Sequence, residues 1–139
     1  MPKSEVFLDT SYAIALAVRA DQNHPQALEL AAWLHQDGIR LVTTWAILLE
    51  IGNSLAKQRY RPAGRALIDA LIGDPSVDVV PLSQTLCARA LELYVQRRDK
   101  EWGLTDCISF VVMDERGIRD ALTADVHFRQ AGFGALLHV

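Results

Sequence analysis

Short apolar runs alternate along the chain with longer segments in which apolar residues recur at helical spacing. The short runs are β-prone and predict strands at 5–8, 40–42, 77–80, 121–123 and 136–138. Helices are predicted at 10–19, 24–35, 44–55, 62–73, 83–94 and 104–117. Because strands alternate with helices, the pattern predicts an α/β sandwich built on a mainly parallel sheet.

Some of the predicted helices carry start and stop signals. Thr10 and Ser11 offer hydroxyl groups where the first helix begins, and Ser83 can cap the helix at 83–94. Pro62 suits the first turn of the helix at 62–73, which ends at Gly73. These signals support the predicted boundaries independently of the apolar spacing.

The length of 139 residues suits one compact unit, so we expect a single domain over residues 1–139. Half of the residues are apolar and 22% are charged, which is the composition of a chain that buries a core. The longest apolar run, 12–18, is far shorter than the roughly 20 residues of a membrane span. Acidic Glu5 and Asp9 interrupt the segment where an export signal would lie. We therefore expect a cytoplasmic protein with no membrane segment.

The charge balance is slightly acidic, with 14 Lys and Arg against 17 Asp and Glu. This argues against a protein that coats nucleic acid through its overall field. Basic residues nevertheless gather in two local clusters: Lys57, Arg59, Arg61 and Arg65, and Arg97, Arg98 and Lys100. Either cluster can bind phosphate groups. Basic residues that simply lie at the solvent-exposed end of a helix would explain each cluster equally well. Charge therefore supports nucleic-acid binding only if other chemistry requires it.

Acidic side chains occupy four places where solvent is expected to be scarce. Asp9 and Asp125 each follow a predicted strand, so a parallel sheet brings both to one edge, where function gathers in such folds. Glu50 is the only acid on an otherwise apolar helix, and Asp106 lies near the start of another. Each acid alone is explained by a helix cap, a turn or an arginine partner.

Together the four acids point to a metal site. Converging carboxylates repel one another by about 4 kcal/mol per close pair at an effective dielectric of 20. Mg²⁺ or Mn²⁺ offsets that repulsion, because these ions favour oxygen ligands. Such an ion lowers the pKa of a bound water and shields charge on a phosphodiester. The pattern indicates metal-dependent phosphodiester hydrolysis.

Motifs for other chemistries are missing from the sequence. There is no GxxxxGK phosphate loop, no GxSxG esterase motif and no HExxH zinc motif. We interpret the histidines, His127 included, as surface or packing residues. A strand-end aspartate also suits an aspartyl-phosphate, but haloacid-dehalogenase-like phosphatases carry a second aspartate where this chain has Ser11.

Four motifs, taken in order, resemble the PIN-domain family, particularly the VapC-type toxins of bacterial toxin–antitoxin pairs. They are LDTS at 8–11, Glu50, WGLTDCISF at 102–110 and LTADVHF at 122–128. The resemblance spans nearly the whole chain. It implies a PIN-like fold, a central mainly parallel sheet with helices on both faces. It also implies an Mg²⁺- or Mn²⁺-dependent endoribonuclease.

The resemblance also implies roles for particular residues. Asp9, Glu50, Asp106 and Asp125 match the family's acidic quartet, with Asp9 and Asp106 as the main metal ligands. Glu50 and Asp125 would bind the metal directly or through water. Ser11, and with less support Thr10, would orient the first carboxylate. His127 stands where some relatives carry a further acid.

Partners follow from the same resemblance. We expect an RNA substrate guided by the two basic clusters, a homodimer and a small cognate antitoxin. Trp33, Trp45 and Leu48 either line the antitoxin groove or belong to the core. Asp99 and Asp114 lie near the site motif, but a loop salt bridge and an exposed helix charge explain them equally well.

A second hypothesis is a catalytically weak module that acts by binding protein or RNA. The acidic quartet would then coordinate a cation or a partner's arginine. Loss of one acid is the simplest sign of a degenerate nuclease, and all four acids are present here.

Overall fold

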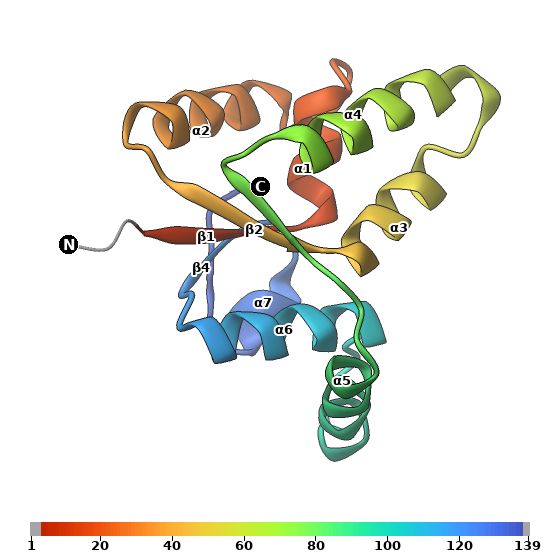
Figure 1. Cartoon of the computed structure of the whole chain (residues 1–139), viewed down its shortest axis with the longest axis vertical. Coiled ribbons are helices and arrows are strands. Elements are labelled where there is room, and N and C mark those ends of the chain that lie inside the picture. The colour runs from red at the N-terminus through yellow and green to blue at the C-terminus, as the bar shows by residue number, and fades with distance from the viewer. Residues whose placement is uncertain (1–3, 138–139) are drawn as a thin grey trace.

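The computed structural model describes residues 4–137 (Figure 1). The strands are β1 (Glu5–Leu8), β2 (Arg40–Thr44), β3 (Val77–Val80), β4 (Asp120–Leu122) and β5 (Gly134–Ala135). The helices are α1 (Thr10–Ala17), α2 (His24–Gln36), α3 (Trp45–Ser54), α4 (Arg61–Gly73), α5 (Gln84–Gln96), α6 (Leu104–Arg116) and α7 (Val126–Gln130). A 3₁₀ turn, η1 (Gln58–Tyr60), lies between α3 and α4.

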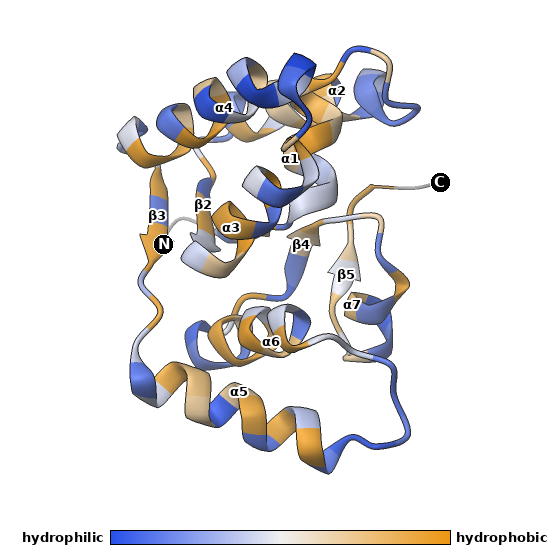
Figure 2. Ribbon diagram, turned by 90° about the vertical axis from the view of Figure 1, so that its right-hand side faces the viewer, coloured by the Kyte–Doolittle hydropathy of each residue, from blue (hydrophilic) through white to orange (hydrophobic). Residues whose placement is uncertain are grey.

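The strands form one sheet in the order β3-β2-β1-β4-β5, and every neighbouring pair is parallel. Helices α1 to α4 cover one face of the sheet and α5 to α7 cover the other, as Figures 1 and 2 both show. The predicted α/β architecture is therefore confirmed. The sheet is parallel throughout the described residues rather than mainly so.

The strand order reverses between β1 and β4. From β1 the chain adds β2 and then β3 on one side, and it later adds β4 and β5 on the other side. In parallel sheets a crevice opens at the carboxyl ends of the two strands that flank such a reversal. Asp9 directly follows β1, and Asp125 follows β4 after the two residues at 123–124. The topology thus brings two of the predicted site residues to this crevice.

Helix ends use the signals that the sequence offers. The Ser83 hydroxyl accepts the backbone N–H of Leu86 at 3.0 Å, which caps α5 as predicted. Gly117 ends α6 with a left-handed backbone at φ 67°, a conformation that glycine adopts without steric cost.

The C-terminal part of the described chain differs from the prediction. A strand was predicted at 136–138, but β5 lies at Gly134–Ala135, and His138 is outside the described residues. Gly134 sits so close to β4 that a Cβ there would overlap the Asp120 carboxylate, so the pairing with β4 begins at a glycine. Helix α7 and the 3₁₀ turn η1 were not predicted. Both are too short to show a helical repeat of apolar residues.

Aromatic packing holds α7 in place beneath the sheet. The Phe128 side chain is fully buried, with its ring edge-on to Phe110 at a centroid distance of 5.0 Å and 6.3 Å from Phe7. This contact joins α7 to α6 and β1. Within residues 4–137, no helix has the length and apolar character that crossing a membrane requires.

We expect Phe128→Ala to lower the free energy of unfolding by about 3 to 5 kcal/mol, because truncating a buried phenylalanine loses apolar contact and leaves a cavity. Urea unfolding followed by circular dichroism measures this loss. Val126→Ala, on the exposed side of the same helix, is the control and should change stability by less than about 0.5 kcal/mol. Equal effects of the two substitutions would contradict the packing role of Phe128.

Candidate metal centre

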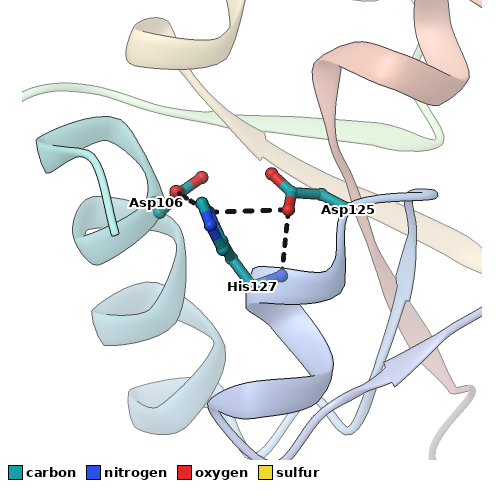
Figure 3. Close-up of side chains that lie close together, drawn as sticks. All are labelled: Asp106, Asp125 and His127. Atoms are coloured by element: carbon teal, nitrogen blue, oxygen red, sulfur yellow. Dashed lines mark hydrogen bonds and ion pairs between the residues drawn. The ribbon is translucent and has the colours of Figure 1, made fainter. Parts of the chain in front are cut away.

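Two carboxylates and one imidazole lie close together beyond the carboxyl end of β4 (Figure 3). Asp106, Asp125 and His127 each offer one ligand atom, and these atoms all lie within 4.8 Å of one another. Nδ1 of His127 is 2.9 Å from Oδ2 of Asp106 and 3.5 Å from Oδ1 of Asp125. The three residues come from the first turn of α6, the turn after β4 and the first turn of α7.

Helix capping fixes both carboxylates of this group. Asp125 is the N-cap of α7, and its Oδ1 accepts the backbone N–H of His127 at 2.9 Å. Asp106 lies in the first turn of α6, where its Oδ2 accepts the backbone N–H of Gly103 at 3.1 Å. The helix-cap explanation therefore holds for Asp106 but not for Asp9, whose side chain makes no cap hydrogen bond to α1. Asp125, explained above by a turn, caps α7, and the caps of α6 and α7 aim both carboxylates at one place.

Asp9 is the most buried of the four predicted acids, with 7% of its surface exposed. The Thr123 hydroxyl donates a hydrogen bond of 2.7 Å to its Oδ2, and the Ser11 hydroxyl lies 3.5 Å from the same oxygen. Burial, more than any other effect, raises the pKa of Asp9 to about 7, and the nearby negative charges of Glu50 and Asp106 act in the same direction. Asp9 thus belongs to the same electrostatic neighbourhood as these two acids.

Glu50 lies in the middle of α3, and its side chain reaches the start of α1. Its Oε1 accepts a hydrogen bond of 2.5 Å from the Thr10 hydroxyl at the start of α1. The Thr10 hydroxyl therefore orients Glu50, while the Thr10 backbone hydrogen-bonds to Asp9. The Ser11 hydroxyl lies 3.3 Å from that of Thr123 and accepts the backbone N–H of Ala124, which links the start of α1 to the turn after β4.

Two residues of this region were not predicted as part of the site. Thr123 is fully buried. Its hydroxyl oxygen accepts the backbone N–H of Asp125 at 3.0 Å, and the hydroxyl group donates its hydrogen to the Asp9 carboxylate. Its position between a strand and a candidate aspartate was the available signal. His127 was interpreted as a surface or packing residue; its ring is partly exposed and faces two carboxylates. The hydrogen bond with Asp106 raises the pKa of His127.

Other candidates lie outside this group. Asp99 forms ion pairs with Arg97 and Lys100, so the loop salt bridge accounts for it. Asp114 is an exposed residue near the end of α6. The suggestion that Leu48 lines a groove is wrong, because its side chain is 1% exposed and belongs to the core. Trp33 and Trp45 are both partly exposed, at 36% and 41%.

One of the two basic clusters, at 97–100, lies just before the start of α6. Arg97, Arg98 and Lys100 line a surface depression of about 620 Å³ that also includes Gly103 and Leu104. Figure 2 shows this connection between α5 and α6 as a hydrophilic segment. Gly103 lines this depression, and its backbone N–H donates a hydrogen bond to the Asp106 carboxylate. The depression therefore lies next to the group formed by Asp106, Asp125 and His127.

The other cluster surrounds the 3₁₀ turn that follows α3. Lys57 and Arg59 line an open surface there, and the Arg59 guanidinium lies 4.8 Å from the Tyr60 ring centroid. Arg61 donates to the Ala56 carbonyl, and Arg65 forms an ion pair with Asp69.

Comparison with known proteins identifies the fold family. A sequence model of the PIN domain matches residues 6–134. The chain belongs to the PIN-domain family. This PIN domain is 28% identical over 134 residues to VapC20 of Mycobacterium tuberculosis, described as a 23S rRNA-specific endonuclease, with 92% of this chain and 95% of that protein covered.

Solved structures show the same fold. The crystal structure of Mycobacterium tuberculosis VapC20, described as a toxin that cleaves the sarcin–ricin loop, superposes with a TM-score of 0.83 at 29% identity over 92% of this chain and 95% of that one. VapBC2 of Rickettsia felis, bound to promoter DNA, gives a TM-score of 0.66 at 13% identity over 94% and 96%. A toxin–antitoxin complex of Klebsiella pneumoniae gives 0.64 at 18% identity over 96% and 99%. The last two share the fold of this PIN domain.

We expect Asp9→Asn to stabilise the metal-free protein above neutral pH. The folded state keeps a proton on Asp9 up to about pH 7, whereas the unfolded chain loses it near the ordinary value of 3.8. Folded protein therefore binds more protons between these values, and its stability falls as the pH rises through this window. At pH 8 the variant should exceed the parent by about 1 to 4 kcal/mol, since each pKa unit corresponds to about 1.4 kcal/mol.

Urea unfolding in the presence of a chelator at pH 4, 6 and 8 measures this difference. The advantage of Asp9→Asn should vanish at pH 4, and exposed Asp114→Asn should show no such trend. A variant less stable than the parent at pH 8 would contradict the buried, uncompensated charge assigned to Asp9.

Proposed function

We propose that this PIN domain is an Mg²⁺- or Mn²⁺-dependent endoribonuclease and the toxin of a type II toxin–antitoxin pair. The observation that carries the proposal is the meeting of Asp106 and Asp125 at the strand-order reversal, within electrostatic reach of buried Asp9. In this assignment Asp9, Glu50, Asp106 and Asp125 are the catalytic, metal-binding set.

The donor set suits a hard divalent cation. Carboxylate oxygens are the protein ligands that Mg²⁺ and Mn²⁺ prefer, and such sites keep water and substrate phosphate as further ligands. Burial, and to a lesser extent the neighbouring acids, raises the pKa of Asp9, so the ionised carboxylate lacks a compensating positive charge. A bound cation supplies that charge, activates water and shields the phosphodiester.

The chain's own residues hold the carboxylates ready for this role. Thr123 fixes Asp9, Thr10 fixes Glu50, and the Gly103 N–H fixes Asp106. Without a cation, the negative charges of the site repel an approaching phosphate. A bound cation is therefore expected to aid RNA binding at the site as well as cleavage.

RNA phosphates are proposed to approach along the basic clusters. Arg97, Arg98 and Lys100 are the first candidates, because their depression includes Gly103, whose N–H holds Asp106. Lys57, Arg59, Arg61 and Arg65 form a second contact region. Arg65 is expected to contribute least there, since Asp69 already neutralises it.

The sarcin–ricin loop of 23S rRNA is the proposed target. Its support is the 28% identity to VapC20, which extends over 92% of this chain rather than over the site motifs alone. The names of the similar complexes support a cognate antitoxin as partner. The homodimer is proposed from the family resemblance alone. Exposed Trp33 and Trp45 are the candidate antitoxin contacts.

We expect Asp106→Asn to reduce cleavage of 23S rRNA by at least 100-fold with folding retained, because the amide cannot supply the charge that holds the cation. Cleavage is mapped by primer extension on ribosomes incubated with purified protein and Mn²⁺. A chelator should abolish cleavage by the parent protein, and re-addition of Mn²⁺ should restore it.

Asp114→Asn makes the same chemical change on the same helix, away from the site, and should leave cleavage unchanged. Full cleavage by Asp106→Asn would overturn the assignment of this ligand. RNA binding by the parent without cleavage in any metal would favour the non-catalytic module instead.

We expect Arg98→Gln to weaken RNA binding and to lower the slope of log K against log salt by about 0.7, the value for one phosphate contact on a single strand. Fluorescence anisotropy with a labelled sarcin–ricin oligonucleotide, in an Asp106→Asn background that leaves the RNA intact, measures the slope. Arg19→Gln, exposed in the turn after α1, is the control and should leave the slope unchanged. An unchanged slope for Arg98→Gln would place the RNA elsewhere.

A further inference from the structure

The imidazole of His127 points into the group formed by Asp106 and Asp125 rather than away from it (Figure 3). Its Nδ1 is 2.9 Å from one carboxylate oxygen and 3.5 Å from the other. The ring thus places a nitrogen where the two acids converge. Neither the acidic quartet nor the basic clusters account for this nitrogen.

The position of His127 is fixed from two sides. Its backbone N–H bonds to the Asp125 carboxylate, so the cap that orients Asp125 also orients the first turn of α7. The next residue, Phe128, is fully buried against Phe110 and Phe7. The ring is held at the acids by these two constraints, and its side chain keeps 27% of its surface exposed.

We propose that His127 is a metal ligand, and that it makes the centre a mixed nitrogen–oxygen site that prefers Mn²⁺ and later transition-metal ions over Mg²⁺. The inference rests on the proposed metal-dependent function and adds a ligand and a selectivity to it. Mg²⁺ demands oxygen ligands in a near-ideal octahedron and parts with water reluctantly. Imidazole nitrogen instead favours transition metals, whose affinities rise from Mn²⁺ towards Cu²⁺.

The other role open to His127 is to orient Asp106 through the 2.9 Å hydrogen bond. The two roles differ in what removal of the ring does. Loss of a positioning residue weakens binding of every ion that uses Asp106, by the same factor for each. Loss of a nitrogen ligand weakens binding of Mn²⁺ more than that of Mg²⁺, which gains little from nitrogen.

Isothermal titration calorimetry of the metal-free chain with Mg²⁺ and with Mn²⁺ compares the parent, His127→Gln and His127→Asp. We expect His127→Gln to weaken Mn²⁺ binding by at least about 10-fold, since even the loss of a residue that only orients a ligand costs that much, and Mg²⁺ binding by clearly less. His127→Asp replaces nitrogen with oxygen and should lower the ratio of Mn²⁺ to Mg²⁺ affinity. His35→Gln, exposed on α2, is the matched control and should change neither affinity.

Pulsed electron paramagnetic resonance of the Mn²⁺-loaded protein detects the ligand directly. A ¹⁴N coupling should be present in the parent and in His35→Gln, and absent in His127→Gln. Equal loss of both affinities, with no nitrogen coupling in the parent, would overturn the proposal and leave His127 as a positioning residue. If Asp106→Asn binds Mn²⁺ as tightly as the parent does, the proposed function fails together with this inference.

Discussion

Repulsion among carboxylates at the carboxyl ends of β1 and β4 is the constraint on which the site depends. Asp9 is buried beside Glu50 and Asp106; burial first, and then the charges of these two acids, raise its pKa to about 7. Folding tolerates the arrangement because one proton can remain on Asp9 and because His127 lies against Asp106. Such a site favours binding of a cation, because the cation displaces the proton on Asp9 and supplies the positive charge that the carboxylates lack.

Local structure and the site are built from the same hydrogen bonds. The Asp125 carboxylate caps α7, and the Asp106 carboxylate accepts the Gly103 N–H at the start of α6. A helix N-terminus favours negative charge, so both positions stabilise the ionised carboxylate while the cluster as a whole opposes it. The fold thus concentrates acids where two helix starts and one strand end meet, and the helix ends offset part of the repulsion.

The sequence predicted the layers of the fold well because its strands and helices have clear, different periods. Prediction was weakest after residue 123, where α7 and β5 are too short to show a period and are held by Asp125, by Phe128 and by the close approach of Gly134 to Asp120. The acids were found because they interrupt apolar segments. Thr123 and His127 were not placed in the site because a buried hydroxyl and a lone imidazole have no spacing rule. Their positions beside Asp125 were the available signal, and their hydrogen-bond partners in the fold make the association explicit.

The two halves of the site differ in their access to solvent. Asp9 lies on the inner side and is held by the hydroxyl of buried Thr123. The side chains of Asp106, Asp125 and His127 keep 18%, 36% and 27% of their surface exposed, on the side of α6 and α7. A macromolecular substrate can reach only the open half, and the depression lined by Arg97, Arg98 and Lys100 lies beside it. Under the proposed function, the inner half sets the charge of the site and the outer half meets the phosphate, so His127, the proposed nitrogen ligand, stands on the side that the substrate reaches.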